Sequence, residues 1–153
     1  MKQYRQRHGR GIRGSLLPEN TPRFQTRRDR FDRTVLEAYA PLQHRFAQQL
    51  QTLDIAIDTV PRMRIRPEAA LASDEIASDG PVPLGRLIPA GVDRSGRPTR
   101  ARIVLFRMPI MNRCVNRQEQ LILLERVLTY LVASYLNMLP TDIEPNFRWP
   151  WEE

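Results

Sequence analysis

The sequence has few of the side chains that bind transition metals or serve as strong nucleophiles. Its 153 residues include one cysteine, Cys114, and two histidines, His8 and His44. A single cysteine cannot form an internal disulfide, which favours a reducing compartment, and we expect a cytoplasmic protein. Zinc needs several converging imidazole, thiolate or carboxylate ligands, and no spaced carboxylate cluster points to a harder cation. We therefore predict neither a metal nor a cofactor.

Targeting segments, long apolar runs and nucleotide-binding motifs are also missing. The N-terminus MKQYRQRHGRGIRG has no apolar stretch of the kind found in secretory signals. The longest uncharged apolar run, residues 127–139, is about one-third shorter than the roughly 20 residues that span a bilayer. There is no GxSxG motif and no P-loop, and GRGIRG at residues 9–14 follows no predicted strand. A soluble protein without a membrane partner is expected.

Positive charge is present in excess only at the N-terminus. Residues 1–33 hold 10 basic and 3 acidic residues and account for the whole net charge of +7, because residues 34–153 hold 14 of each. Such a leader is suited to neutralising phosphates, although a solvated tail without a dedicated partner is an equally simple interpretation. The candidate anion-binding residues are Arg5, Arg7, Arg10, Arg13, Arg23, Arg27 and Arg28.

Nearly all of the basic residues are arginines, and Lys2 is the only lysine. Arginine forms bidentate bonds to phosphate and stacks on bases, so the bias suits nucleic acid. A codon bias of the genome explains it as well, because the bias runs through the neutral part of the chain too.

The first third of the chain predicts a flexible leader followed by a helix. Residues 1–25 lack hydrophobic periodicity, which is typical of an extended or disordered segment. Thr26 and Asp29 have the spacing of a helix cap, and Pro41 predicts a kink or break further on. The helix should be amphipathic, with apolar residues at steps of three and four: Leu36, Tyr39, Leu42, Phe46, Leu50 and Leu53.

The middle of the chain predicts a small sheet. LDIAIDTVP indicates a strand that ends near Pro61, and residues 62–83 read as a long loop. LGRLIPA, which begins at Leu84, and ARIVLFRM, which begins at Ala101, are two further strands. GVDRSGRP lies between them as a hairpin connection, so these two strands are expected to pair in antiparallel orientation.

The C-terminal third predicts a buried helix and an aromatic tail. Asn116 and Glu119 have capping-box spacing, and the helix should run to about Asn137 because Pro140 cannot continue it. Apolar residues on most of its sides indicate a covered helix. The tail, residues 146–153, contains two tryptophans that either pack back onto the domain or form an exposed aromatic contact.

These segments predict an α+β fold with an N-terminal helix, a short mixed or antiparallel sheet of about three or four strands, and a buried C-terminal helix. The expected organisation is a disordered basic leader over residues 1–25, a single small domain over residues 26–145, and the tryptophan-containing tail over residues 146–153.

Several stretches resemble one protein family. They are RHGRGIRGSLLP, RFDRTVLEA, DTVP, VPLGRLIPAG, RIVLFRMPI and VASYLNMLPTDIEP, which are scattered over nearly the whole chain. On these stretches the chain resembles the small bacterial minimal zincin-like proteins, a metallopeptidase family, and looks closest to a branch that lacks the zinc motif. The resemblance implies a zincin-like domain.

Active members of that family carry HExxH on the last helix, where two histidines bind zinc and the glutamate polarises the attacking water. The resemblance places this motif on residues 130–134, with Tyr130 and Ser134 at the ligand positions and Leu131 at that of the base. The later acidic ligand would fall near Pro140, with Asp142 two residues further on. Leucine has no exchangeable proton, and neutral hydroxyls are poor zinc ligands, so we expect no catalytic residue.

The expected function is therefore that of a catalytically inactive, zincin-like binding or scaffold protein, a pseudo-metallopeptidase. Its leader would contact an anionic partner such as nucleic acid or a ribonucleoprotein. Two alternatives remain open. One is a hydrolase with a remodelled active site, and the other is a structural subunit that binds a protein segment in the former cleft, along the edge of the sheet.

Overall fold

The computed structural model describes residues 26–61 and 75–152. The candidate residues Arg5, Arg7, Arg10, Arg13 and Arg23 lie outside these ranges, as does most of the expected long loop. The chain divides into two units between Arg33 and Thr34, and both sheets lie in the larger, C-terminal unit.

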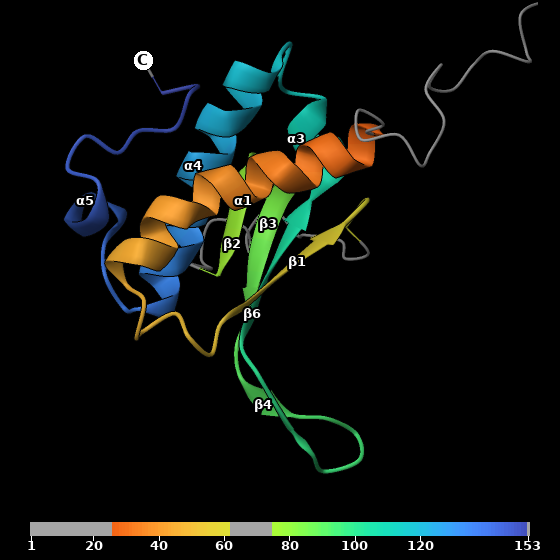
Figure 1. Cartoon of the computed structure of the whole chain (residues 1–153), viewed down its shortest axis with the longest axis vertical. Coiled ribbons are helices and arrows are strands. Elements are labelled where there is room, and N and C mark those ends of the chain that lie inside the picture. Colours follow the sequence, from red (N-terminus) through yellow and green to blue (C-terminus); the bar gives the residue numbers. More distant parts are fainter. Residues whose placement is uncertain (1–25, 62–74, 153) are drawn as a thin grey trace, which may run out of the picture. The chain divides into compact units, whose positions relative to one another are not determined.

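A four-stranded mixed sheet forms the centre of this unit (Figure 1). Its strands lie in the order β1 (Asp54–Asp58), β6 (Arg102–Phe106), β3 (Val82–Ile88) and β2 (Ile76–Asp79). β1 runs parallel to β6, whereas β3 is antiparallel to both β6 and β2. The predicted α+β class and the antiparallel pairing of the second and third predicted strands are confirmed.

The connection between β3 and β6 is a second, smaller sheet rather than a simple turn. β4 (Gly91–Val92) pairs in antiparallel orientation with β5 (Pro98–Thr99). Figure 1 shows this two-stranded ribbon projecting beyond the end of the four-stranded sheet. The predicted hairpin connection is thus present, and it has strand structure of its own.

The prediction of one long loop over residues 62–83 is wrong at its C-terminal end, where β2 forms an edge strand. The segment IASD has weak β-propensity, since alanine, serine and aspartate are not typical of strands. Pairing with β3 decides its conformation: Ala77 lies opposite Gly85 and is buried, and a register irregularity follows between Ala77 and Ser78.

The strand expected over residues 101–108 ends earlier than predicted. β6 stops at Phe106 and the chain turns at once into the short helix α3 (Arg107–Met111). Pro109 lies in the first turn of α3, where a missing backbone N–H is tolerated. The N–H of Met108 donates to the Thr59 carbonyl oxygen at 3.0 Å, which ties the start of α3 to the end of β1.

Helix α1 (Arg27–Arg45) has the predicted cap. The Asp29 N–H donates to Thr26 Oγ1 at 3.0 Å, and the Thr26 N–H donates to Asp29 Oδ2 at 3.2 Å. The helix continues through Pro41, so the expected break does not occur. Pro41 lies on the exposed side, where water can bind the carbonyl that its missing N–H leaves unpaired.

The apolar face predicted for this helix is partly wrong. Leu36 is 67% exposed, and the helix ends at Arg45, so Leu50 and Leu53 are buried in the turns that follow it. The sequence pattern was ambiguous because Val35, Ala38 and Leu42 are also apolar and also follow one another at steps of three and four. In residues 34–45 the buried hydrophobic residues are Val35, Ala38, Tyr39 and Leu42.

Helix α4 (Arg117–Tyr135) is the predicted buried C-terminal helix and packs on β2 and β3. Asn116 Oδ1 accepts the Glu119 N–H at 2.9 Å, and the Glu119 carboxylate accepts the Val115 N–H at 2.7 Å, one residue before the predicted partner. Among residues 26–61 and 75–152, no helix has both the length and the apolar character needed to cross a membrane. The core side chains with no exposed surface include Leu84, Ile103, Leu105, Ile110, Leu124, Leu128 and Leu131.

Candidate functional site

Helix α4 ends in a left-handed turn at Asn137, whose φ is +56°. The Asn137 N–H donates to the Ser134 carbonyl oxygen at 3.2 Å, and the Met138 N–H donates to the Ala133 carbonyl oxygen at 2.8 Å. These two bonds form a Schellman motif, which satisfies carbonyls that the end of a helix leaves unpaired. Asparagine is one of the few residues other than glycine that enter this conformation readily.

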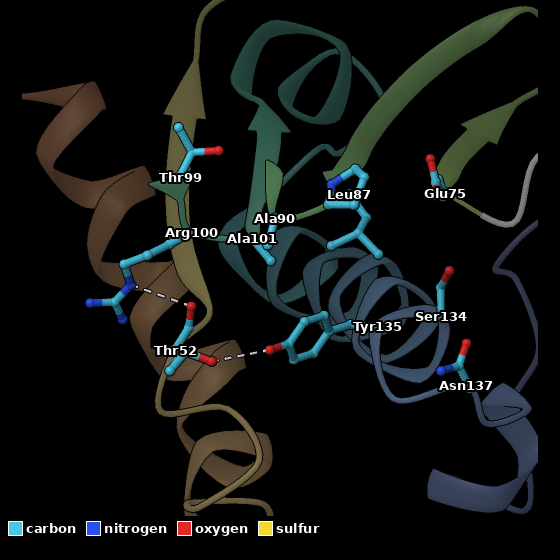
Figure 2. Close-up of a pocket in the computed structure, with 11 residues that line it drawn as sticks. Thr52, Glu75, Leu87, Ala90, Thr99, Arg100, Ala101, Ser134, Tyr135 and Asn137 are labelled. Atoms are coloured by element: carbon cyan, nitrogen blue, oxygen red, sulfur yellow. Dashed lines mark hydrogen bonds between the residues drawn. The ribbon is translucent and has the colours of Figure 1, made fainter. Parts of the chain in front are cut away.

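A pocket of about 480 Å³ opens beside this helix end, and we name it the α4-end pocket (Figure 2). Segments far apart in the sequence form its walls: the C-terminus of α4, the start of β2, the end of β3 and the residues before β1 and β6. Its lining residues are Thr52, Glu75, Leu87, Pro89, Ala90, Thr99, Arg100, Ala101, Ser134, Tyr135 and Asn137.

The pocket combines an apolar floor with polar groups around it. Leu87 and Ala101 are buried, whereas the hydroxyl of Tyr135 and the Thr52 Oγ1 lie 3.3 Å apart and share a hydrogen bond. Figure 2 shows Ser134 and Asn137 at the end of α4 and Glu75 on the neighbouring strand segment. Such a mixture fits a small ligand or a short peptide segment with both apolar and polar groups.

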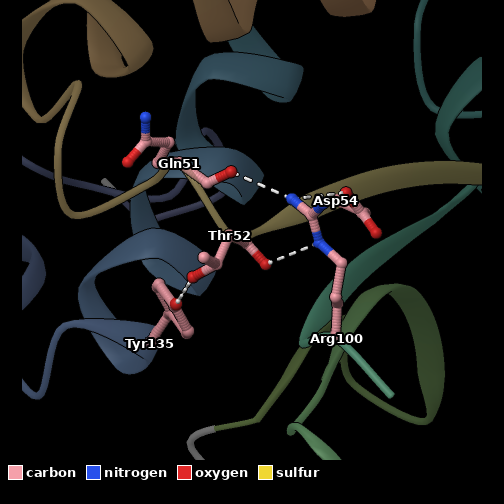
Figure 3. A network of polar contacts seen from close by, with 5 residues as sticks. All are labelled: Gln51, Thr52, Asp54, Arg100 and Tyr135. Carbon is pink, nitrogen blue, oxygen red and sulfur yellow. Dashed lines mark hydrogen bonds and ion pairs between the residues drawn. The ribbon is translucent and has the colours of Figure 1, made fainter. Parts of the chain in front are cut away.

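Arg100 fixes the chain segment that carries Thr52 (Figure 3). Its Nη2 donates to the Gln51 carbonyl oxygen at 2.9 Å and lies 3.2 Å from Asp54 Oδ1, and its Nε donates to the Thr52 carbonyl oxygen at 3.4 Å. The side chains of Arg100 and Asp54 are both more than half exposed, so water weakens each contact. Arg100 therefore acts as a positioning residue for one wall of the pocket.

The three positions expected to replace the zinc motif have three different environments. Leu131 is fully buried beneath β3, and its Cδ1 lies 3.0 Å from the place that a Cβ on Gly85 would occupy. Ser134 lines the α4-end pocket. Tyr130 instead packs against the tail, with its ring centroid 5.4 Å from that of Trp149. Only one of the three positions thus lines the pocket.

The C-terminal tail folds back onto α4, which confirms one of the two alternatives for its tryptophans. Trp149 stacks on Trp151, with ring centroids 5.1 Å apart and an interplanar angle of 6°. Phe147 meets Trp149 edge-on at 5.4 Å. The outer ring, that of Trp151, stays 40% exposed. Aromatic pairs at these separations contribute beyond the area they bury, so the cluster anchors the tail over Tyr130.

Asp142, the acidic residue nearest the expected later ligand position, caps a helix. Its Oδ2 accepts the Leu139 N–H at 2.9 Å at the start of α5 (Pro140–Ile143). The carbonyl oxygen of Ile143, at the end of the same helix, accepts a hydrogen bond from Arg45 Nη1 at 2.7 Å. The Asp142 carboxylate therefore stabilises the start of α5.

The remaining candidates are not among the residues that line the pocket. Arg27 and Arg28 are exposed at the start of α1, and His44 is exposed near its end.

Burial raises the pKa of the Cys114 thiol to about 11, and Glu119 adds to this effect. A thiol that resists ionisation is a poor nucleophile at neutral pH. Within the parts of the chain that the structure describes, no group of three or more His, Cys, Asp or Glu side chains is arranged to hold a metal.

The sequence did not point to Thr52, Arg100 or Tyr135 as site residues. Thr52 and Tyr135 are separated by 83 positions, and nothing in either local pattern predicts their hydrogen bond. Asn137 did carry a signal, because asparagine after a helix and shortly before a proline is typical of a left-handed C-terminal cap.

Comparison with models of known protein families finds none that matches this chain, and comparison with functionally curated proteins finds no match either. The resemblance to zincin-like proteins therefore enters the functional argument as a proposal.

Proposed function

We propose that this protein is a non-catalytic, zincin-like domain that acts by binding, and that its basic leader contacts nucleic acid or a ribonucleoprotein. The burial of Leu131 carries the first part of the proposal. In HExxH enzymes the corresponding glutamate acts on a metal-bound water, and so its carboxylate needs a polar, accessible cleft. The Leu131 side chain lies in the apolar contact between α4 and β3, beneath Gly85.

The end of α4 supports the alignment with the zinc motif. In metalloproteases whose motif continues as HExxHxxGxxH, the glycine comes three residues after the second histidine. Asn137 comes three residues after Ser134 and adopts the left-handed conformation that favours glycine. Under this alignment Asn137 takes the place of the glycine at the turn, while the side chains at positions 130, 131 and 134 are unsuited to zinc.

Substitutions in α4 test the non-catalytic part. Leu131→Glu should destabilise the protein strongly, since a carboxylate would be buried without a partner, whereas Ile122→Glu on the exposed side of α4 should have little effect. Urea unfolding measures the stability of both variants.

Elemental analysis of the purified natural protein should find no stoichiometric zinc. Stoichiometric zinc would contradict the proposed loss of the metal site, and peptide hydrolysis by the natural protein would establish the hydrolase alternative.

The charge distribution supports the second part. Residues 1–33 carry the whole net charge of +7, and the rest of the chain is neutral. Each phosphate that a basic residue contacts makes binding more sensitive to salt. For duplex DNA the logarithm of the binding constant falls by about 0.9 per contact for each tenfold rise in salt concentration. The leader is thus expected to bind nucleic acid in a salt-sensitive manner.

Deletion of residues 1–25 tests the leader. Binding of labelled RNA and DNA should weaken and its salt slope should fall, because the deletion removes Lys2 and five of the candidate arginines. The midpoint of thermal unfolding should hardly change. Equal affinity of the full-length and shortened proteins at low salt would contradict the proposal.

A protein segment bound beside β2 is a second candidate function. β2 is an edge strand of the sheet, and Glu75, the residue immediately before it, lines the α4-end pocket together with Ser134. Edge strands accept an additional strand through their backbone groups. Pull-down from lysate with and without nuclease separates the candidates, because a protein held through nucleic acid is lost on nuclease treatment and one held at the edge is retained.

A further inference from the structure

We infer that the β4–β5 ribbon is a second nucleic-acid contact, one that enters the major groove of duplex DNA, independently of the leader. The ribbon arm, residues 89–100, is exposed at every position. It projects past the end of the four-stranded sheet (Figure 1). Its strand residues Gly91 and Val92 pair with Thr99 and Pro98, so the arm keeps a defined shape without a core of its own.

The turn at the end of the arm is held by local hydrogen bonds. Asp93 Oδ1 accepts the N–H groups of Ser95 at 2.8 Å and of Arg97 at 2.9 Å. The Asp93 N–H donates to the Arg97 carbonyl oxygen at 2.9 Å, and Gly96 has a φ of +82°. Together these bonds close a compact turn, which reduces the entropy lost when the arm binds a partner.

The charge of the arm is complementary to a phosphate backbone. Arg94 and Arg97 lie in the turn and are exposed. The carboxylate of Asp93, the arm's only acidic residue, faces the turn's own backbone N–H groups. Arg100 at the base is already bound to Gln51, Thr52 and Asp54, so it belongs to the pocket wall and not to this surface. Arg94 and Arg97 therefore form the contact.

The dimensions of the arm favour B-form DNA. A two-stranded ribbon fits the major groove, which is about 12 Å wide and about 8.5 Å deep. At the strand rise of about 3.3 Å per residue, the four steps from residue 89 to residue 93 span about 13 Å, which exceeds that depth. The major groove of A-form RNA is too narrow for side chains to read. Val92 is 69% exposed, and an apolar side chain of this kind can contact a thymine methyl group.

The test compares two double variants of the full chain that lose the same charge. Arg94→Gln with Arg97→Gln removes the contact, and Arg126→Gln with Arg148→Gln, outside the arm, is the control. We expect the arm variant to bind duplex DNA about tenfold more weakly at low salt, with a salt slope lower by about 0.9 per lost phosphate contact. The control should match the natural sequence. Equal losses in both variants would mean that only net charge matters and would overturn the proposal.

Further measurements identify the partner and separate the effect of the ribbon arm from that of the leader. Protection of guanine N7 from dimethyl sulfate should be present with the natural sequence and lost with the arm variant. An equal or larger arm-dependent effect on duplex RNA, or on vesicles containing phosphatidylserine, would overturn the assignment to DNA. The same pair of variants is also measured without residues 1–25. If the arm variant still binds duplex DNA more weakly in the protein without residues 1–25, the result supports the ribbon contact even if the leader binds nothing. If deletion of residues 1–25 does not change the affinity, the result counts only against the leader.

Discussion

Leu131 on α4 packs against Gly85 on β3, at a point where the sheet has no side chain of its own. A Cβ at Gly85 would lie 3.0 Å from Leu131 Cδ1 and 3.2 Å from both Leu105 Cδ2 and the Val104 carbonyl oxygen. Contacts this short require a neighbour to move. Glycine at residue 85 thus lets α4 lie directly on β3, with Leu131 filling the contact between them.

Gly85→Ala should destabilise the protein by about 1–3 kcal/mol, the usual effect of overpacking a core. Part of the loss should be recovered in the double variant with Leu131→Val, which shortens the clashing side chain, although the Val104 carbonyl still opposes the new methyl group. Urea unfolding gives the coupling between the two sites, and about 0.5 kcal/mol or more is expected. Gly91→Ala is the matched control, since its nearest neighbour would be 3.9 Å away and little change is expected. Strictly additive effects at residues 85 and 131 would contradict this packing.

Arg100→Ala should destabilise the fold by about 1 kcal/mol, because the side chain holds two backbone carbonyls and a carboxylate at an exposed site. Asp54→Asn should have a smaller effect, since the carbonyl contacts remain. Arg100→Lys should recover only part of the loss because an ammonium lacks the planar fork of donors. Thermal unfolding ranks the three variants, and Arg148→Ala is the exposed control. An effect of Asp54→Asn as large as that of Arg100→Ala would show that the ion pair, and not the carbonyl contacts, accounts for the stabilisation.

Asn137→Ala should destabilise the protein by about 1 kcal/mol, because alanine is strained in the left-handed conformation at the end of α4. Asn137→Gly should be neutral or slightly stabilising, since glycine adopts the same turn without strain. Chemical denaturation measures both, with Asn112→Ala, at an exposed right-handed position after α3, as the control. An alanine variant as stable as the natural protein would mean that the turn does not require positive φ.

Because the Cys114 thiol is partly buried, we expect the free energy of unfolding to fall at alkaline pH. Burial raises the pKa of its thiol from 9.0 to about 11 in the folded protein. The folded state therefore keeps its proton more tightly than the unfolded chain does. The associated stability is fully present below pH 9 and is lost as the pH rises from 9 through 11. Cys114→Ala should flatten this part of the stability profile, measured by urea unfolding from pH 8 to 11. Alkylation of the native thiol at pH 8 should also be slower than that of free cysteine, and an equal rate would contradict the raised pKa.

Local patterns were sufficient wherever the determining interactions lie within a few residues. The cap at Thr26 formed as predicted, and Asn116 accepts the predicted Glu119 N–H, since each of these bonds joins groups three residues apart. The Glu119 carboxylate binds the Val115 N–H in place of that of Asn116. The end of α4 before Pro140 and the buried character of that helix followed from its composition. The face of α1 did not follow in the same way, because neighbouring apolar positions fit the helical period equally well and only packing selects between Val35 and Leu36.

The sequence by itself determined the two long helices α1 and α4, the α+β class, the hairpin and the charge of the leader, because these depend on local periodicity, capping and composition. The tertiary structure decided that β2 is a strand, that Leu131 lies under Gly85, and that Thr52, Arg100 and Tyr135 meet around one pocket. Each of these depends on contacts between residues far apart in the chain. Their free energy comes from close packing and strand pairing, which appear only once the sheet and α4 are assembled.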